Sequence, residues 1–190
     1  KTVQFAVSRT GGTATSADLT VPTTTFSIPP GATTATFNVT IIDDTLDEDD
    51  ETAVLSLGGL VNATAGAQAT HTITITDNDD PPQVRFDPTT PDRSATEANL
   101  TFTYRVILSA PSTKQITVPV TLGGSADNKD YDIGTGDIPV VFQPGQTAKD
   151  IRVIVKDDNA KESDETITLQ LGTPTNATNA GDNQLRTHTI

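Results

Sequence analysis

The sequence predicts an all-β chain made of two tandem immunoglobulin-like antiparallel β-sandwiches, one over residues 1–80 and one over residues 81–190. Three observations carry this prediction. The chain holds 36 Thr, which together with Val and Ile favours strands. Apolar and polar residues alternate, and 13 Gly and 12 Pro interrupt the alternation at short intervals. The same motifs also recur in the same order about 112–117 residues later, as in an internal duplication.

The first repeat opens on a strand-like stretch at 1–7, which a turn at Gly11-Gly12 follows. Two later stretches alternate with a period of two residues, and their apolar positions are Phe37, Val39 and Ile41, then Ala53, Leu55 and Leu57. A Pro30-Gly31 turn precedes the first of these stretches. One inward face, short strands and frequent turns predict a sandwich of two sheets.

The second repeat shows the same elements and two additional opening strands, which we expect at 83–86 and 100–108. Its later strands are expected around 151–155 and 167–171. The first repeat has no counterpart of the opening strands, and the second stops before the counterpart of residues 74–80. We therefore expect the first sandwich to lack its opening strands and the second its closing strand. Strands from outside residues 1–190, or from another chain, would then cover the exposed edges.

An acidic segment occurs once in each repeat. Residues 43–51 read DDTLDEDDE and residues 157–165 read DDNAKESDE, with the shared pattern D-D-x-x-x-E-x-D-E. Seven acids within nine residues repel one another unless a cation neutralises them. A hard divalent ion with carboxylate ligands does this best, and calcium accepts more such ligands than magnesium does. The segment therefore predicts calcium binding.

Composition argues against several other classes of function. The net charge is −13 and no basic stripe is present, which disfavours nucleic acid and anionic membrane surfaces as partners. No apolar run approaches the length of a membrane span. The crowded carboxylates have no aromatic platform for a sugar beside them, so we expect no enzyme. An acidic, Thr-rich chain without Cys suits an extracellular or cell-surface protein, and we expect a bacterial one.

Four motifs together resemble the Calx-β domain, a repeat of exchanger regulatory loops, integrin β4 and bacterial surface proteins. They are G-T-A-x-x-x-D at 12–18, P-G-x-T at 30–33 and 144–147, I-I-D-D-x-x-x-E-x-D-E at 41–51, and T-I-T-D-x-D at 74–79. The resemblance covers nearly the whole chain. It implies a β-sandwich that carries calcium in loops at one end.

The resemblance also implies the ligands. In the first repeat they are Asp18, Asp43, Asp44, the Leu46 carbonyl, Glu48, Glu51, Asp77 and Asp79. In the second repeat they are Glu97, Asp130, Asp157, Asp158, the Ala160 carbonyl, Glu162 and Glu165. Asn78 replaces an acid at one corner of the first site, and Lys161 lowers the negative charge of the second. The two His, His71 and His188, occupy duplicated strand positions and are not expected to bind metal.

These features predict a calcium-binding structural repeat of an extracellular or cell-surface protein, such as a stalk, an adhesin or a filament segment. Residues 77–80 belong both to the first site and to the linker, so calcium would stiffen the junction between the domains. Neighbouring repeats or identical chains are the expected partners, joined by strand exchange. The alternative is a regulatory calcium sensor attached to a membrane transporter, which flanking membrane spans would distinguish.

Overall fold

The computed structural model describes residues 1–94, 96, 100–157, 161 and 163–190. The chain divides into two compact units. The first unit consists of Lys1–Thr45 and Asp49–Asn78, and the second of Leu46–Glu48 and Asp79–Ile190. The domain boundary after residue 80 stays a prediction.

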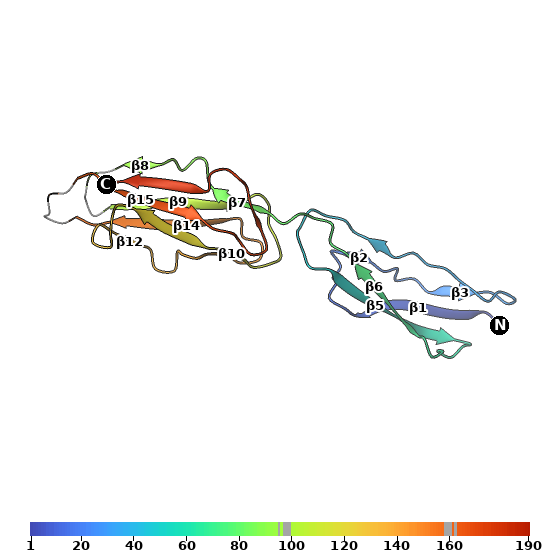
Figure 1. The fold of residues 1–190 in the computed structure, drawn as a ribbon. Helices are drawn as coiled ribbons and strands as arrows, with labels where there is room; N and C mark the ends of the chain where they lie inside the picture. Colours follow the sequence, from blue (N-terminus) through green and yellow to red (C-terminus); the bar gives the residue numbers. More distant parts are fainter. Residues whose placement is uncertain (95, 97–99, 158–160, 162) are drawn as a thin grey trace. The chain divides into compact units, whose positions relative to one another are not determined.

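The first unit is built from six strands (Figure 1). These are β1 (Val3–Gly11), β2 (Leu19–Thr20), β3 (Phe26–Ile28), β4 (Thr40–Ile41), β5 (Glu51–Val61) and β6 (Thr70–Ile75). One sheet has the order β3-β1-β5-β6, and β2 pairs with β4 in a second, two-stranded sheet. All pairings in this unit are antiparallel.

The described residues of the second unit form eleven strands. They are β7 (Gln83–Phe86), β8 (Arg93–Ser94), β9 (Leu100–Leu108), β10 (Ile116–Val118), β11 (Val120–Gly124), β12 (Tyr131–Ile133), β13 (Val140–Phe142), β14 (Ala148–Val155), β15 (Thr166–Leu171), β16 (Thr178–Asn179) and β17 (Leu185–Thr189). The two larger sheets have the orders β12-β14-β9-β7-β16 and β11-β15-β17-β8, and β10 pairs with β13. The all-β fold and the bounds of both opening strands, β7 and β9, are confirmed.

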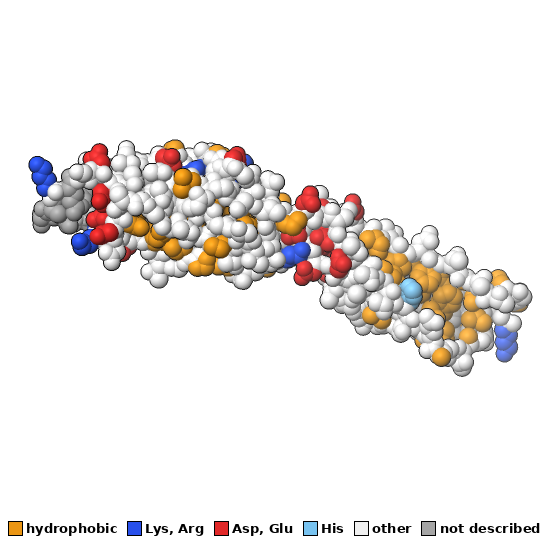
Figure 2. Space-filling view, viewed as in Figure 1, with side chains coloured by type: hydrophobic (Ala, Val, Ile, Leu, Met, Phe, Trp, Pro, Cys, Tyr) orange, Lys and Arg blue, Asp and Glu red, His pale blue; other side chains and the backbone are white. Residues whose placement is uncertain are grey.

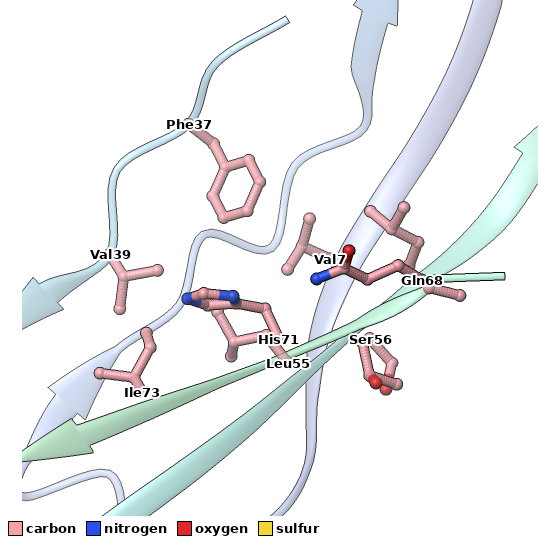
Figure 3. Close-up of a pocket in the computed structure, with 11 residues that line it drawn as sticks. Val7, Phe37, Val39, Leu55, Ser56, Gln68, His71 and Ile73 are labelled. Carbon is pink, nitrogen blue, oxygen red and sulfur yellow. The ribbon is translucent and has the colours of Figure 1, made fainter. Parts of the chain in front are cut away.

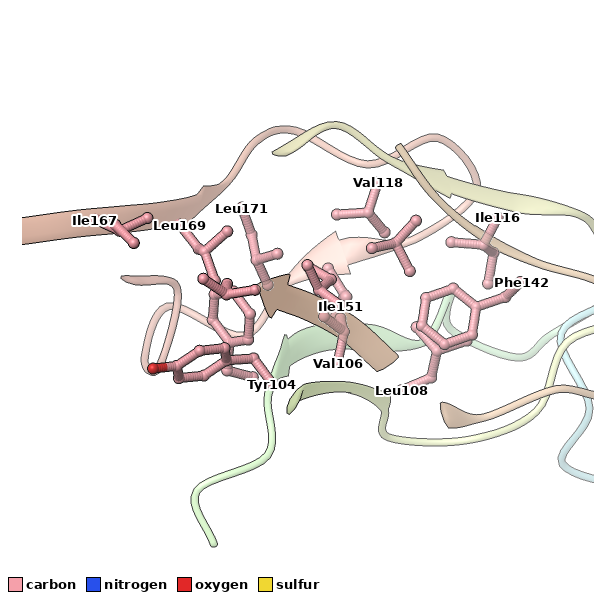
Figure 4. Packing of buried hydrophobic residues seen from close by; sticks show 14 residues of the cluster. Tyr104, Val106, Leu108, Ile116, Val118, Phe142, Ile151, Ile167, Leu169 and Leu171 are labelled. Carbon is pink, nitrogen blue, oxygen red and sulfur yellow. The ribbon is translucent and has the colours of Figure 1, made fainter. Parts of the chain in front are cut away.

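The core of the second unit lies between its two larger sheets (Figure 4). Side chains from β9, β14 and β15 alternate inward, and the innermost are less than 2% exposed, among them Tyr104, Val106, Ile151, Ile167 and Leu169. Burying each such side chain contributes roughly 1.5–3 kcal/mol. Apolar burial is therefore the main source of stability in this unit.

Burial raises the pKa of Tyr104 to about 12. An unfolded tyrosine titrates near pH 10, so the folded state keeps its proton to a higher pH than the unfolded state does. This stability contribution is complete below about pH 10 and is lost as the pH rises through about 12. We expect the urea midpoint of the second unit to fall across this range, and Tyr104→Phe to reduce the fall by more than Tyr131→Phe does. A Tyr104→Phe variant that tracks the wild type would contradict this.

Arg186 is a buried cation that the sequence does not reveal. It is 7% exposed, and its Nε donates to the Thr90 carbonyl at 2.8 Å. Its Nη2 donates to the Asp87 carbonyl at 3.1 Å, and its guanidinium lies 5.3 Å from the centre of the Phe86 ring. Arg186 thus fastens the loop after β7 onto the core by hydrogen bonds and a cation–π contact.

The first unit has a thinner core. Its buried apolar residues are Phe5, Val7, Ala14, Leu19, Ala53 and Leu55, and stacked rings of Phe5 and Phe26 lie 5.5 Å apart. Side chains become more exposed along β5, since Leu55 (labelled in Figure 3) is 5% exposed and Leu57 is 40% exposed. Opening strands equivalent to β7 and β9 are absent from the described part of this unit, as the sequence predicts.

Two expected strands differ from those in the structure. The alternating stretch at 37–41 forms a strand only at Thr40–Ile41, because it pairs there with β2 alone. A strand needs a partner, and the alternation does not supply one. In the second unit β17 pairs with β15 over five positions, so the strand forms as far as Thr189. Residues 81–190 do not include a counterpart of the end of β6 or of the acidic turn after it.

Matching asparagines support the internal duplication. Asn62 and Asn176 both adopt positive φ, 58° and 57°. The side-chain amide of Asn62 donates to the Thr2 carbonyl at 2.8 Å, and that of Asn176 donates to the Gln115 carbonyl at 2.9 Å. The residue after each acceptor, Val3 or Ile116, begins a strand. Val3 and Ile116 are therefore structural equivalents.

Candidate metal centre

A tight turn places Asp18 at one end of the first unit. The Thr15 amide and hydroxyl both donate to the Asp18 carboxylate, and the Ile42 amide donates to the Asp18 carbonyl at 2.8 Å. Gly12 precedes this turn with a φ of +94°, and a Cβ there would collide with the Thr52 carbonyl. Glycine thus lets the turn approach the start of β5, where Glu51 lies.

The Asp18 carboxylate is 9% exposed, yet its pKa lies below the usual value. The hydrogen bond from the Thr15 amide is the main cause, and burial opposes it. Hydrogen bonds to the charged form stabilise that form. Asp18 is therefore held as an anion at neutral pH, as a calcium ligand must be.

Three carboxylates converge beside the Asp18 turn. Asp18, Glu48 and Glu51 each offer one oxygen, and these oxygens lie within 4.8 Å of one another. Calcium binds oxygens at about 2.3–2.6 Å, so two ligands of one ion lie at most roughly 5 Å apart. The spacing fits one shared ion, and red side chains gather at this end of the unit (Figure 2).

The segment after β6 lies beside the acidic loop. The Asn78 side-chain amide donates to Asp43 Oδ1 at 3.2 Å, and the Asp77 amide donates to Asp50 Oδ1 at 3.0 Å. Two of the expected ligands, Asp43 and Asp77, therefore lie where residues 77–78 contact the acidic loop. Neither the Asp44 nor the Asp79 carboxylate belongs to the cluster of Asp18, Glu48 and Glu51, and the expected ligand at Leu46 is a backbone carbonyl. Asp50 was not predicted, although its place among seven acids was a signal.

Asp47 has a different role from its neighbours. It is 3% exposed, accepts a hydrogen bond from the Ser112 hydroxyl, and pairs with Lys114 Nζ at 2.9 Å. The Thr113 amide also donates to the Asp47 carbonyl at 3.0 Å. These bonds hold Leu46–Glu48 within the second unit. The shared acidic pattern leaves position 47 open, so it does not reveal this buried, paired carboxylate.

The second repeat builds the equivalent turn. The Asp127 amide donates to the Asp130 carboxylate, and the Lys156 amide donates to the Asp130 carbonyl at 2.8 Å. Asp157 is exposed, and Glu165 exchanges backbone hydrogen bonds with Ile190. The other expected ligands, Glu97, Asp158, Ala160 and Glu162, lie outside the described residues.

Lysines set the second acidic end apart from the first. Lys156 stands where the first repeat has Ile42, and its Nζ lies 2.7 Å from the Asn128 carbonyl and 3.0 Å from Asp132. Lys129 lies 3.8 Å from Asp127. These positive charges oppose the binding of a divalent cation. The first acidic end is therefore the more strongly anionic of the two.

Comparison with known proteins decides the family. The Calx-beta domain matches twice, over residues 1–79 and over residues 77–190. The chain belongs to the Calx-beta family. Calx-beta domains bind calcium and serve as regulatory or structural modules, and the convergence of Asp18, Glu48 and Glu51 fits that ion.

The chain is also similar to one curated relative and to two solved structures. It is 35% identical over 156 residues to Extracellular matrix protein 3 of Lytechinus variegatus, covering 78% of this chain but only 5% of that protein. The crystal structure of CBD12 from CALX1.2 has 22% sequence identity to this chain and a TM-score of 0.41. The match covers 96% of this chain and 70% of the CBD12 chain. The crystal structure of the apo-form Calx CBD1 domain has 20% sequence identity and a TM-score of 0.45. That match covers 58% of this chain and 96% of the CBD1 chain.

Proposed function

We propose that this chain is a calcium-binding structural repeat of an extracellular or cell-surface protein, in which calcium stiffens the junction between domains. The convergence of Asp18, Glu48 and Glu51 within a Calx-beta domain carries the proposal. The extracellular setting is supported by the similarity to Extracellular matrix protein 3. A stalk, adhesin or filament segment needs binding and stiffness rather than catalysis. A bacterial source stays a prediction.

The cluster is the centre of the proposed first site. Asp43, Asp44, the Leu46 carbonyl, Asp77 and Asp79 would complete the oxygen shell, since calcium accepts six to eight ligands from separate loops. Asp130, Asp157 and Glu165 would contribute to a weaker second site, with Glu97, Asp158, Ala160 and Glu162. The described residues include no helix long and apolar enough to cross a membrane.

The first unit ends beside the acidic loop. Asp77 and Asn78 are bonded to Asp50 and Asp43 of the acidic loop. Without a cation, the carboxylates of this loop repel one another and oppose these bonds. An ion that neutralises them would hold the outgoing segment more firmly. Neighbouring repeats or identical chains, joined in part by strand exchange, would be the partners of a chain stiffened in this way.

Small-angle scattering tests the stiffening. We expect the profile of residues 1–190 to indicate a narrower range of shapes in millimolar calcium than in chelator. Asp77→Asn should reduce the difference, and Asp182→Asn, an exposed acid of the second unit, should leave it unchanged. Identical profiles with and without calcium would refute the stiffening. If the chain still binds calcium in that case, the alternative function, a regulatory calcium sensor attached to a membrane transporter, becomes the better explanation.

A further inference from the structure

The loop Ser112–Lys114 of the second unit surrounds the carboxylate of Asp47. The Ser112 hydroxyl donates to Asp47 Oδ2, and Lys114 Nζ lies 2.9 Å from Asp47 Oδ1, so each carboxylate oxygen has its own donor. The Asp47 side chain is 3% exposed and the Lys114 side chain is 21% exposed. A carboxylate that is removed from water depends on such charge-assisted bonds. The loop therefore matches one buried carboxylate in both charge and hydrogen bonding.

The backbone joins the same two segments. The Thr113 amide donates to the Asp47 carbonyl at 3.0 Å, and Asp47 and Ser112 form a parallel β-bridge. Two further bonds shape the loop without Asp47. The Lys114 amide donates to the Ser112 hydroxyl at 3.0 Å, and the Gly145 amide donates to the Ser112 carbonyl at 2.9 Å. The second unit thus holds the loop in the form that receives Asp47.

The acidic segments of the two repeats carry opposite charges at this one position. Lys161 stands where the first repeat has Asp47, whereas the acids of the shared pattern are the same in both segments. A lysine in place of Asp47 would bring a second ammonium group beside Lys114, in a site almost closed to water. Burying like charges together is strongly unfavourable. The loop Ser112–Lys114 therefore fits the acidic segment of the first repeat and not that of the second.

We propose that Ser112–Lys114 is a recognition site for a buried carboxylate, which accepts an acidic segment with Asp at position 47 and rejects one with Lys there. The site needs no metal ion, because Lys114 supplies the neutralising charge. It holds Leu46–Glu48 on the second unit in the absence of calcium. This goes beyond stiffening by calcium. The acids of the shared pattern serve the ion, and position 47 decides which acidic segment the loop accepts.

Hydrogen exchange of single amides, followed by NMR in chelator, tests the recognition. Asp47→Lys gives the first segment the charge of the second, and it should speed exchange of the Thr113 amide by about tenfold or more. The Gly145 amide should keep its rate, because its acceptor Ser112 belongs to the loop itself. Asp49→Lys is the matched control, since it makes the same charge change at an exposed position two residues further on. It should leave the Thr113 amide unchanged.

Exchanging the two charges separates recognition from simple damage. Lys114→Asp alone should also speed exchange of the Thr113 amide, since it places two carboxylates together. The double variant Asp47→Lys/Lys114→Asp should return the rate to within about threefold of the wild type, because the opposite charges face each other again.

Three results would overturn the proposal. They are a Thr113 amide that stays protected in Asp47→Lys, a double variant that exchanges as fast as the single variants, and a wild-type Thr113 amide that is protected only in calcium. An Asp49→Lys variant that exchanges as fast as Asp47→Lys would also overturn it, because the loop would then respond to net charge alone. Since these measurements are made in chelator, their failure would leave the calcium site of the proposed function standing.

Discussion

Calcium at about a hundredfold excess over its Kd is expected to raise the melting temperature of the first unit by roughly 10–20 °C. Such an excess stabilises a folded state by about 2.7 kcal/mol, because the ion binds the assembled loops and not the unfolded chain. A unit of this size shifts by about 4–8 °C per kcal/mol. Scanning calorimetry with calcium and with chelator measures the difference.

The variant Glu48→Gln/Glu51→Gln should lose most of this calcium-dependent rise, since it removes two charges from the three-carboxylate cluster. The matched control is Asp150→Asn/Asp182→Asn, which removes the same charge from exposed acids of the second unit. The control should keep the rise. If both double variants respond to calcium as the wild type does, the ion does not bind at this cluster.

Phe142→Ala is expected to destabilise the second unit by about 3–5 kcal/mol, the usual cost of removing a buried aromatic ring. Phe142 is fully buried, so its removal leaves a cavity that the surrounding side chains cannot fill. In the first unit, Phe26 is partly exposed and stacks on Phe5. Phe26→Ala should cost the first unit about half as much or less, because water already reaches that cluster.

Urea unfolding with separate probes for the two units measures both losses. Equal losses would show that the cluster around Phe26 is as enclosed as the cluster around Phe142, and would contradict the expectation.

Local sequence was sufficient for much of the fold. The expected strands at 83–86 and 100–108 coincide with β7 and β9, because alternation and flanking turn residues mark strands that are buried on one face. The stretch at 37–41 carries the same alternation yet forms a strand only at Thr40–Ile41. Pairing depends on a partner strand, which residues 37–41 do not encode.

In the acidic loop, too, the sequence predicted part of the outcome and the tertiary contacts decided the rest. Its sequence indicated calcium, and the family resemblance named eight ligands in the first repeat. Three of them, Asp18, Glu48 and Glu51, have carboxylate oxygens within 4.8 Å of one another in the fold. The shared pattern leaves position 47 open, and it did not indicate that the Asp47 carboxylate is buried against Ser112 and Lys114. Asp50, which accepts a hydrogen bond from the Asp77 amide, was likewise not distinguished.

The sequence by itself determined that this protein is a duplicated, acidic, all-β chain of the Calx-beta type, because composition, alternation and repeated motifs can be read from the residues without any tertiary contact. Only the tertiary structure decided which acids converge, which one is buried in an ion pair, and which apolar face stays open. Those outcomes depend on contacts between residues distant in sequence, such as Asp18 with Glu51 and β14 with β9. Burial and charge neutralisation act through such contacts, so only the folded chain shows where they occur.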